Sequence, residues 1–184
     1  PLFTGFDAGT AAMQFVEQRA WIPAYDIQYH LGADGLSVPL IGLTTLVGVL
    51  VLVGAWGSVQ KRVAQYFACL MFLEGAMVGV FCALDAMLFY VFFEAMLIPM
   101  FLIIGVWGGP RRIYAAMKFF LYTFLGSVLM LVALVYLYIK GGSFQLADLY
   151  ALPLSAQEQT WIFFAFLIAF AVKVPMFPVH TWLP

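Results

Sequence analysis

Long apolar stretches separated by short polar breaks make up most of this chain. A transmembrane helix needs about 20 mostly apolar residues, and several stretches reach that length with one charge or none. We predict about five spans, at residues 36–59, 66–84, 86–107, 113–139 and 161–179. The pattern therefore predicts an all-α integral membrane protein.

Polar and helix-breaking residues set the predicted boundaries. As a single helix, residues 66–107 would be about 63 Å long, roughly twice the thickness of the hydrocarbon core. The chain must therefore turn back, and Asp85 is the polar residue near the middle. Gly108, Gly109 and Pro110 predict a loop before the fourth span.

The fifth span carries two prolines near its end. Pro175 and Pro178 each lack a backbone donor and obstruct the preceding turn, so we predict a break just after Lys173. Inside a bilayer such a break needs protein or water to satisfy the freed carbonyl groups. This neighbourhood is therefore a candidate aqueous pocket.

The first 35 residues have a different pattern. They mix charged residues with isolated aromatic ones, among them Trp21, Tyr25 and Tyr29, which suit a membrane interface. We predict a non-spanning interfacial segment at 1–35, followed by a transmembrane helical region at 36–184. No cleavable signal sequence is recognisable, and because the chain begins at Pro1 without an initiator Met, we expect it to be a piece of a longer protein.

Basic residues predict the orientation, because loops on the cytoplasmic or matrix side are enriched in Lys and Arg. Lys61 and Arg62 follow the first span, and Arg111 and Arg112 follow the third, so all four are expected on one face. Residues 1–35, Asp85 and the loop 140–160 are expected on the opposite face.

Composition supports the membrane prediction and excludes other classes. The chain is 65% hydrophobic and 9% charged, with a net charge of −1, so neither a water-soluble domain nor a nucleic-acid partner fits. Cys69 and Cys82 do not predict a disulfide, a metal site or an iron–sulfur cluster. We expect no metal and no cofactor in this chain.

Four ionisable residues lie inside the predicted spans: Glu74, Glu94, Lys118 and Lys173. A charge at mid-bilayer costs roughly 2.5–3.5 kcal/mol, so such residues usually face a partner, a cavity or a conduction path. Glu94 lies about 12 Å into its span and Lys173 about 18 Å into its own. Burial raises the pKa of a carboxyl and a nearby cation lowers it, so a cation that approaches and withdraws would load and unload a proton. We predict that Glu94 and Lys173 form such a pair.

Each candidate also has a structural interpretation. Glu94 and Lys173 would then be a static ion pair, and Glu74, beside the small residues Gly75 and Gly79, would join two helices. Lys118 would extend its amine to the nearby interface. His180, after Pro178, is either a proton relay or an ordinary loop histidine.

Two strings carry a family resemblance: FYVFFEAMLIPMFLIIGVWGG at 89–109 and AFAVKVPMFPVHTWLP at 169–184. With YHLGADGLSVPL at 29–40 and MKFFLYTFLGSVLMLVALVYLY at 117–138, they cover most of the chain. The combined set resembles the antiporter-like M-type subunits of proton-pumping NADH:quinone oxidoreductase, respiratory complex I. The resemblance implies the third to seventh helices of a longer antiporter-like bundle, with the last one discontinuous after Lys173.

The resemblance also implies a function and a setting. Glu94 and Lys173 match the family's proton-translocation residues without substitution, which implies a non-redox subunit of a translocating enzyme. NADH, FMN, iron–sulfur clusters and quinone are then expected in partner subunits, and the partners are other complex I membrane subunits, lipid, protons and water. The bacterial inner membrane is favoured, with the mitochondrial inner membrane as the alternative. Two other functions stay open: a multisubunit cation/proton antiporter subunit and a structural membrane scaffold.

Overall fold

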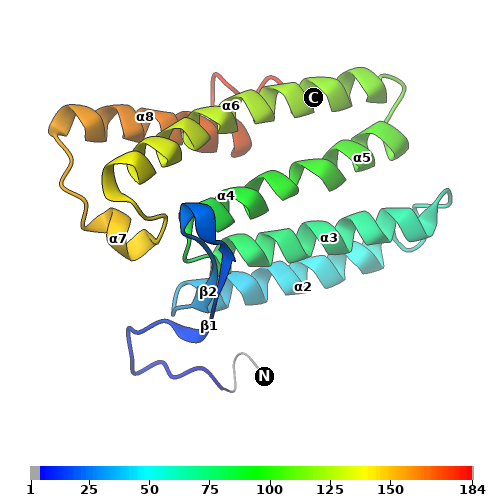
Figure 1. Cartoon of the computed structure of the whole chain (residues 1–184). Helices are drawn as coiled ribbons and strands as arrows, with labels where there is room; N and C mark the ends of the chain where they lie inside the picture. Colours follow the sequence, from blue (N-terminus) through cyan, green and yellow to red (C-terminus); the bar gives the residue numbers. More distant parts are fainter. Residues whose placement is uncertain (1–4, 184) are drawn as a thin grey trace. The chain divides into compact units, whose positions relative to one another are not determined.

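The computed structural model describes residues 5–183 and is mostly helical (Figure 1). The chain forms two compact units, Pro1–Met96 and Leu97–Pro184. Ser37–Ala55, Val63–Cys82, Ala86–Trp107 and Arg112–Gly141 are long and apolar enough to cross a membrane. The predicted helical membrane fold is confirmed. Residues 1–4 and 184, at the outer ends of the predicted regions 1–35 and 36–184, lie outside the described part.

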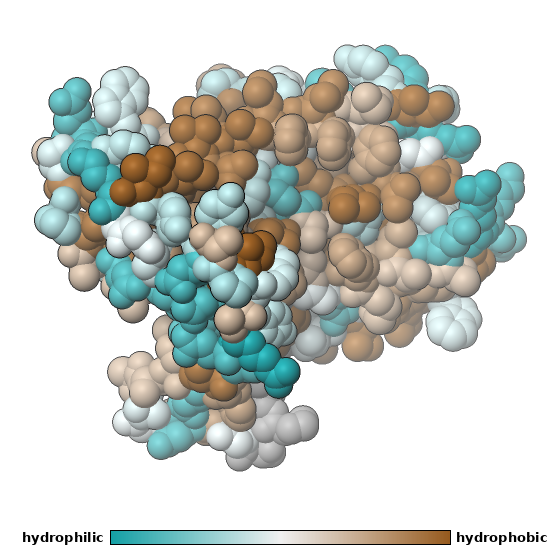
Figure 2. Space-filling view, viewed as in Figure 1, coloured by the Kyte–Doolittle hydropathy of each residue, from teal (hydrophilic) through white to brown (hydrophobic). Residues whose placement is uncertain are grey.

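The first unit begins with a β-hairpin that the all-α prediction did not include. Strands β1 (Gln14–Ile22) and β2 (Ile27–Ala33) pair antiparallel, and the 3₁₀ turn η1 (Pro23–Tyr25) joins them. Irregular pairing interrupts the ladder between Gln14 and Glu17. Without a clean alternation of apolar and polar residues, the usual strand signal is weak here. In Figure 2, hydrophilic residues gather over the hairpin of this unit, whereas its helices are mainly hydrophobic.

Three helices complete the first unit: α2 (Ser37–Ala55), α3 (Val63–Cys82) and α4 (Ala86–Ala95). Helix α3 packs against both α2 and α4. Gly79 lets α4 approach closely, since a Cβ atom there would lie 2.6 Å from the ring of Phe92.

Asp85 ties the hairpin to the turn between α3 and α4. Its carboxylate is fully buried and caps α4 by accepting hydrogen bonds from the backbone N–H groups of Met87 (2.9 Å) and Leu88 (3.0 Å). The same carboxylate accepts from Gln28 N–H on β2 at 3.1 Å. Leu84 N–H also donates to the His30 carbonyl at 2.9 Å. The hairpin and Asp85 therefore lie at the same end of this unit, in agreement with the orientation predicted from charge.

The second unit contains α5 (Leu97–Trp107), α6 (Arg112–Gly141), the short α7 (Leu146–Tyr150) and α8 (Ala156–Lys173). Helix α6 packs against both α5 and α8. It ends at Gly142, which adopts the left-handed conformation (φ 74°) and donates its N–H to the Tyr138 carbonyl.

The third predicted span, 86–107, has the bounds of a helix long and apolar enough to cross. Within it one turn residue, Met96, separates α4 from α5, because Pro99 lacks the N–H group that would bind the Ala95 carbonyl. Helix α8 begins earlier than the predicted fifth span, at Ala156, and ends at Lys173, where the prolines predict the break. Residues 174–183 form turns instead of helix. The four helices long and apolar enough to cross do not include α8, so a fifth crossing stays a prediction.

Candidate functional site

Glu94 lies at the end of α4, two residues before the interruption at Met96. Asp85 caps the start of its helix, and within the helix the rings of Phe89 and Phe93 stack with their centroids 5.8 Å apart. Phe93 is buried, and Glu94 itself is half-buried. The turn residue two positions after the Glu94 carboxyl group is a feature that the sequence analysis missed, although Pro99 was its signal.

Glu74 lies on α3 of the same unit and faces α2. A Cβ atom on Gly48 would lie 2.7 Å from the Glu74 carboxyl carbon, so the carboxyl group occupies the space that this glycine leaves open. Glu74 is half-buried, and none of the described residues forms a hydrogen bond or ion pair with it. This contact fits the structural interpretation of a helix-joining residue and leaves the carboxyl group able to bind something else.

Lys173 is the last residue of α8 and is half-buried. The preceding residue, Val172, packs against Gly126 of α6, where an added Cβ atom would lie 3.1 Å from Val172 Cβ. The Val172 carbonyl accepts a hydrogen bond from Trp182 Nε1 at 2.8 Å. Close helix packing and the returning tail therefore hold the end of α8 that carries Lys173.

The tail after α8 folds back onto the first half of α6. Lys118 Nζ donates to the Thr181 carbonyl, and the rings of Phe119 and Trp182 meet edge to face at 5.1 Å. Lys118 is thus bound to the tail, a contact that neither snorkelling nor the sequence spacing predicted. Thr181 and Trp182 were missed as site residues because only the fold brings the tail back to α6.

His180 lies in this tail and is half-buried. Its ring is 5.7 Å from that of Phe177, and its buried Nδ1 has no hydrogen-bond partner among the described residues. Through the contacts of Thr181 and Val172, the second unit brings Lys118, His180 and the end of α8 together.

At the other end of the α6–α8 pair, a charged cluster joins the two helices. Lys140 Nζ lies 2.7 Å from Glu158 Oε1, and the Tyr136 hydroxyl donates to the same carboxylate. Ser155 and Glu158 form a capping box at the start of α8. Glu158 precedes the apolar part of α8, and hydrogen bonds from Lys140, Tyr136 and Ser155 hold its pKa well below the ordinary value.

Glu94 belongs to the first unit and Lys173 to the second. Their predicted pairing therefore remains a prediction. What the two residues share is their place at helix ends, because Glu94 lies two residues before the turn at Met96 and Lys173 is the last residue of α8. Backbone carbonyl groups that lose their helical partners at such points need water or protein partners.

Known proteins similar to this chain agree with the resemblance. A family model described as NADH:quinone oxidoreductase/Mrp antiporter, TM, matches residues 83–184. NADH-quinone oxidoreductase subunit M of Rhodobacter capsulatus is 53% identical over 196 residues, covering 100% of this chain and 38% of the relative. NADH-ubiquinone oxidoreductase chain 4 of Arabidopsis thaliana is 46% identical over 185 residues, covering 100% and 37%. The chain thus spans less than two fifths of the length of these relatives.

Solved structures show the same fold. A chain of respiratory complex I from Thermus thermophilus matches with a TM-score of 0.82 and 37% identity, over 92% of this chain and 36% of that one. A chain of the Mrp complex from Dietzia sp. matches with a TM-score of 0.87 over 96% of this chain and 20% of that one, but at 20% identity it shares only the fold. The predicted resemblance and the membrane location are confirmed. This chain belongs to the NADH:quinone oxidoreductase/Mrp antiporter transmembrane family.

Proposed function

We propose that this chain is part of a proton-translocating membrane subunit of NADH:quinone oxidoreductase. The observation that carries the proposal is that both ionisable side chains lie at helix ends: Glu94 two residues before the turn at Met96, and Lys173 as the last residue of α8. A straight transmembrane helix offers no site for water, whereas an interrupted one exposes polar backbone groups beside the titratable side chain.

Glu94 and Lys173 act as a charge-coupled pair in this proposal. A nearby ammonium group lowers the pKa of a carboxyl, and its withdrawal in a poorly hydrated environment raises it. A change in the distance or charge of Lys173 would therefore make Glu94 bind or release a proton. His180 and Lys118 would extend the path on the second unit, and Glu74 on the first, with water completing it.

The energy source lies outside this chain. NADH, FMN, iron–sulfur clusters and quinone would be bound by other subunits, and this chain would carry the proton step of the translocase. The bacterial relative named above is 53% identical and the plant relative 46%, so the bacterial inner membrane is favoured and the mitochondrial inner membrane is the alternative. Its partners are then other complex I membrane subunits and the lipid bilayer.

The test is Glu94→Gln in the full-length subunit within the assembled complex. Gln keeps the shape of the side chain but cannot exchange a proton, so proton pumping per NADH oxidised should fall at least about tenfold. Glu17→Gln, on the exposed strand β1, is the matched control and should pump normally. Normal pumping by a fully assembled Glu94→Gln complex would refute the proposal.

A cation/proton antiporter subunit is the second candidate, favoured by the shared fold with the Mrp complex. It could use the same ionisable residues without a redox partner. Purification of the full-length protein from its native membrane distinguishes the two functions. Flavin and iron–sulfur subunits that copurify in fixed proportion support the oxidoreductase, and their absence together with sodium- or potassium-driven proton exchange supports the antiporter.

A further inference from the structure

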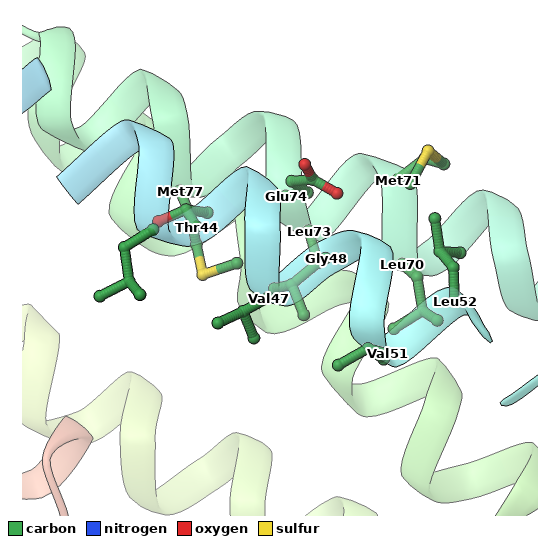
Figure 3. Close-up of a pocket in the computed structure, with 11 residues that line it drawn as sticks. Thr44, Val47, Gly48, Val51, Leu52, Leu70, Met71, Leu73, Glu74 and Met77 are labelled. Carbon is green, nitrogen blue, oxygen red and sulfur yellow. The ribbon is translucent and has the colours of Figure 1, made fainter. Parts of the chain in front are cut away.

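An apolar groove runs between α2 and α3 in the first unit (Figure 3). Its volume is about 300 Å³, and leucine, valine and methionine side chains from both helices form most of its surface. Among the described residues that line it, Glu74 alone is ionisable. Thr44, the other polar side chain there, donates its hydroxyl to the Leu40 carbonyl at 2.8 Å.

Glu74 lies near the middle of α3, a helix long and apolar enough to cross a membrane. It is the twelfth residue of α3, about 16 Å along the helix axis from Val63, and α3 is about as long as the hydrocarbon core is thick. Lipid head groups do not reach this depth. Within residues 5–183, no cation or hydrogen-bond donor binds the carboxyl group. A charged or polar group at this depth is costly unless a partner from elsewhere satisfies it.

The face around Glu74 is also poorly covered. Several of the side chains that line the groove are exposed, among them Val47, Val51 and Met71. The family match begins at residue 83, after the end of α3, so the groove lies outside the matched module. An apolar groove with one central carboxyl group complements a transmembrane helix that carries one basic residue.

We infer that the α2–α3 groove docks a transmembrane helix of a neighbouring subunit, whose Lys or Arg side chain binds Glu74. The inference rests on the proposed function, which makes this chain part of a multisubunit membrane complex. Gly48 positions the acceptor, because any larger residue there would push the Glu74 carboxyl group out of the space it occupies. The apolar groove excludes water from the ion pair, and the pair selects the partner helix and its depth.

Cross-linking in the assembled complex tests the inference. Val47→Cys places a thiol in the groove, and Leu50→Cys, three residues along α2, places one outside the groove on an exposed position. After labelling with a maleimide–benzophenone reagent and illumination in native membranes, Val47→Cys should cross-link to another subunit. The cross-linked residue should lie within about one turn of a Lys or Arg, and Leu50→Cys should not give this product.

Glu74 variants show whether the charge selects the partner. Glu74→Gln should lower the Val47→Cys cross-link yield by about 3- to 30-fold, the range expected for one interhelical polar contact in lipid. Gly48→Ala should lower it in the same direction because it displaces the carboxyl group. An unchanged yield in Glu74→Gln, a product only with lipid or with this chain itself, or equal products from Val47→Cys and Leu50→Cys would each overturn the inference.

These outcomes are independent of the Glu94 test. If Glu94→Gln stops pumping and Val47→Cys gives no subunit product, the docking inference fails and the proposed function stands. If the product forms in a complex that pumps normally with Glu94→Gln, the proposed function fails and the docking surface stands.

Discussion

The helix pairs α2–α3 and α6–α8 both pack closely at a glycine, but the glycine faces a carboxyl group in the first pair and an apolar side chain in the second. Gly126 admits the apolar Val172, and a charged cluster at one end and the folded tail at the other reinforce the contact. Gly48 admits the carboxyl group of Glu74, and no described residue satisfies it. The α6–α8 pair therefore satisfies its polar groups within this chain, whereas the α2–α3 pair presents the Glu74 carboxyl group as a hydrogen-bond acceptor.

The difference shows where a membrane protein can bind an ionisable side chain with backbone groups of the same chain. Near helix ends the backbone is available, so Asp85 receives three N–H donors and Lys118 finds the carbonyl group of Thr181. In the middle of a helix the backbone groups bind one another. Glu74 therefore depends on a side chain from another element, and Glu94 has a broken helix beside it.

The largest effect on stability is expected at the buried Asp85. Asp85→Ala removes the α4 cap and leaves the half-buried Gln28 N–H group without its acceptor, which should lower the free energy of unfolding by roughly 3 kcal/mol. Unfolding in mixed micelles, followed by circular dichroism, measures this loss. Asp148→Ala, at an exposed position in α7, is the control and should change stability by less than about 0.5 kcal/mol. Equal effects of the two variants would contradict the structural role of Asp85.

An intermediate effect is expected where α6 meets α8. Gly126→Leu forces a side chain into Val172 and should destabilise the second unit by about 1–3 kcal/mol, while separating the end of α8 from α6. Faster hydrogen exchange in residues 170–183 would report that separation. Gly75→Leu on α3 is the matched control, because a Cβ atom there meets nothing within 4 Å. A Gly126→Leu protein with unchanged exchange would show that the two helices do not need this close contact.

The smallest effect concerns pH. Because the pKa of Glu158 in the folded protein is below its ordinary value of 4.5, its cluster with Lys140 and Tyr136 stabilises the start of α8 above that pH. As the pH falls below 4.5 the stabilisation decreases progressively, because the carboxyl group of the unfolded chain binds a proton before that of the folded protein does. Hydrogen exchange at residues 155–160, corrected for the intrinsic pH dependence, should therefore rise between pH 5 and pH 3. Glu158→Gln should exchange faster at pH 5 and lose this pH dependence.

Several features could be predicted from single residues. Asp85 marked a turn because a carboxylate is costly in lipid, and the prolines at 175 and 178 predicted the end of α8 because neither can donate a backbone hydrogen bond. The break at Met96 was missed although Pro99 was visible, since a proline within a long apolar stretch is often tolerated in membrane helices. The hairpin was missed because its strands lack regular alternation.

The sequence by itself determined that lipid surrounds the helices and how long the helices are. It also determined that four ionisable side chains lie within apolar stretches, where a charge is energetically unfavourable: Glu74, Glu94, Lys118 and Lys173. These properties depend on hydrophobicity and on spacing along one chain. Tertiary structure alone decided that Thr181 binds Lys118, that Gln28 binds Asp85 and that Gly48 faces Glu74. Such contacts join residues 26 to 63 positions apart, and their formation depends on how whole helices pack, which no local pattern of residues encodes.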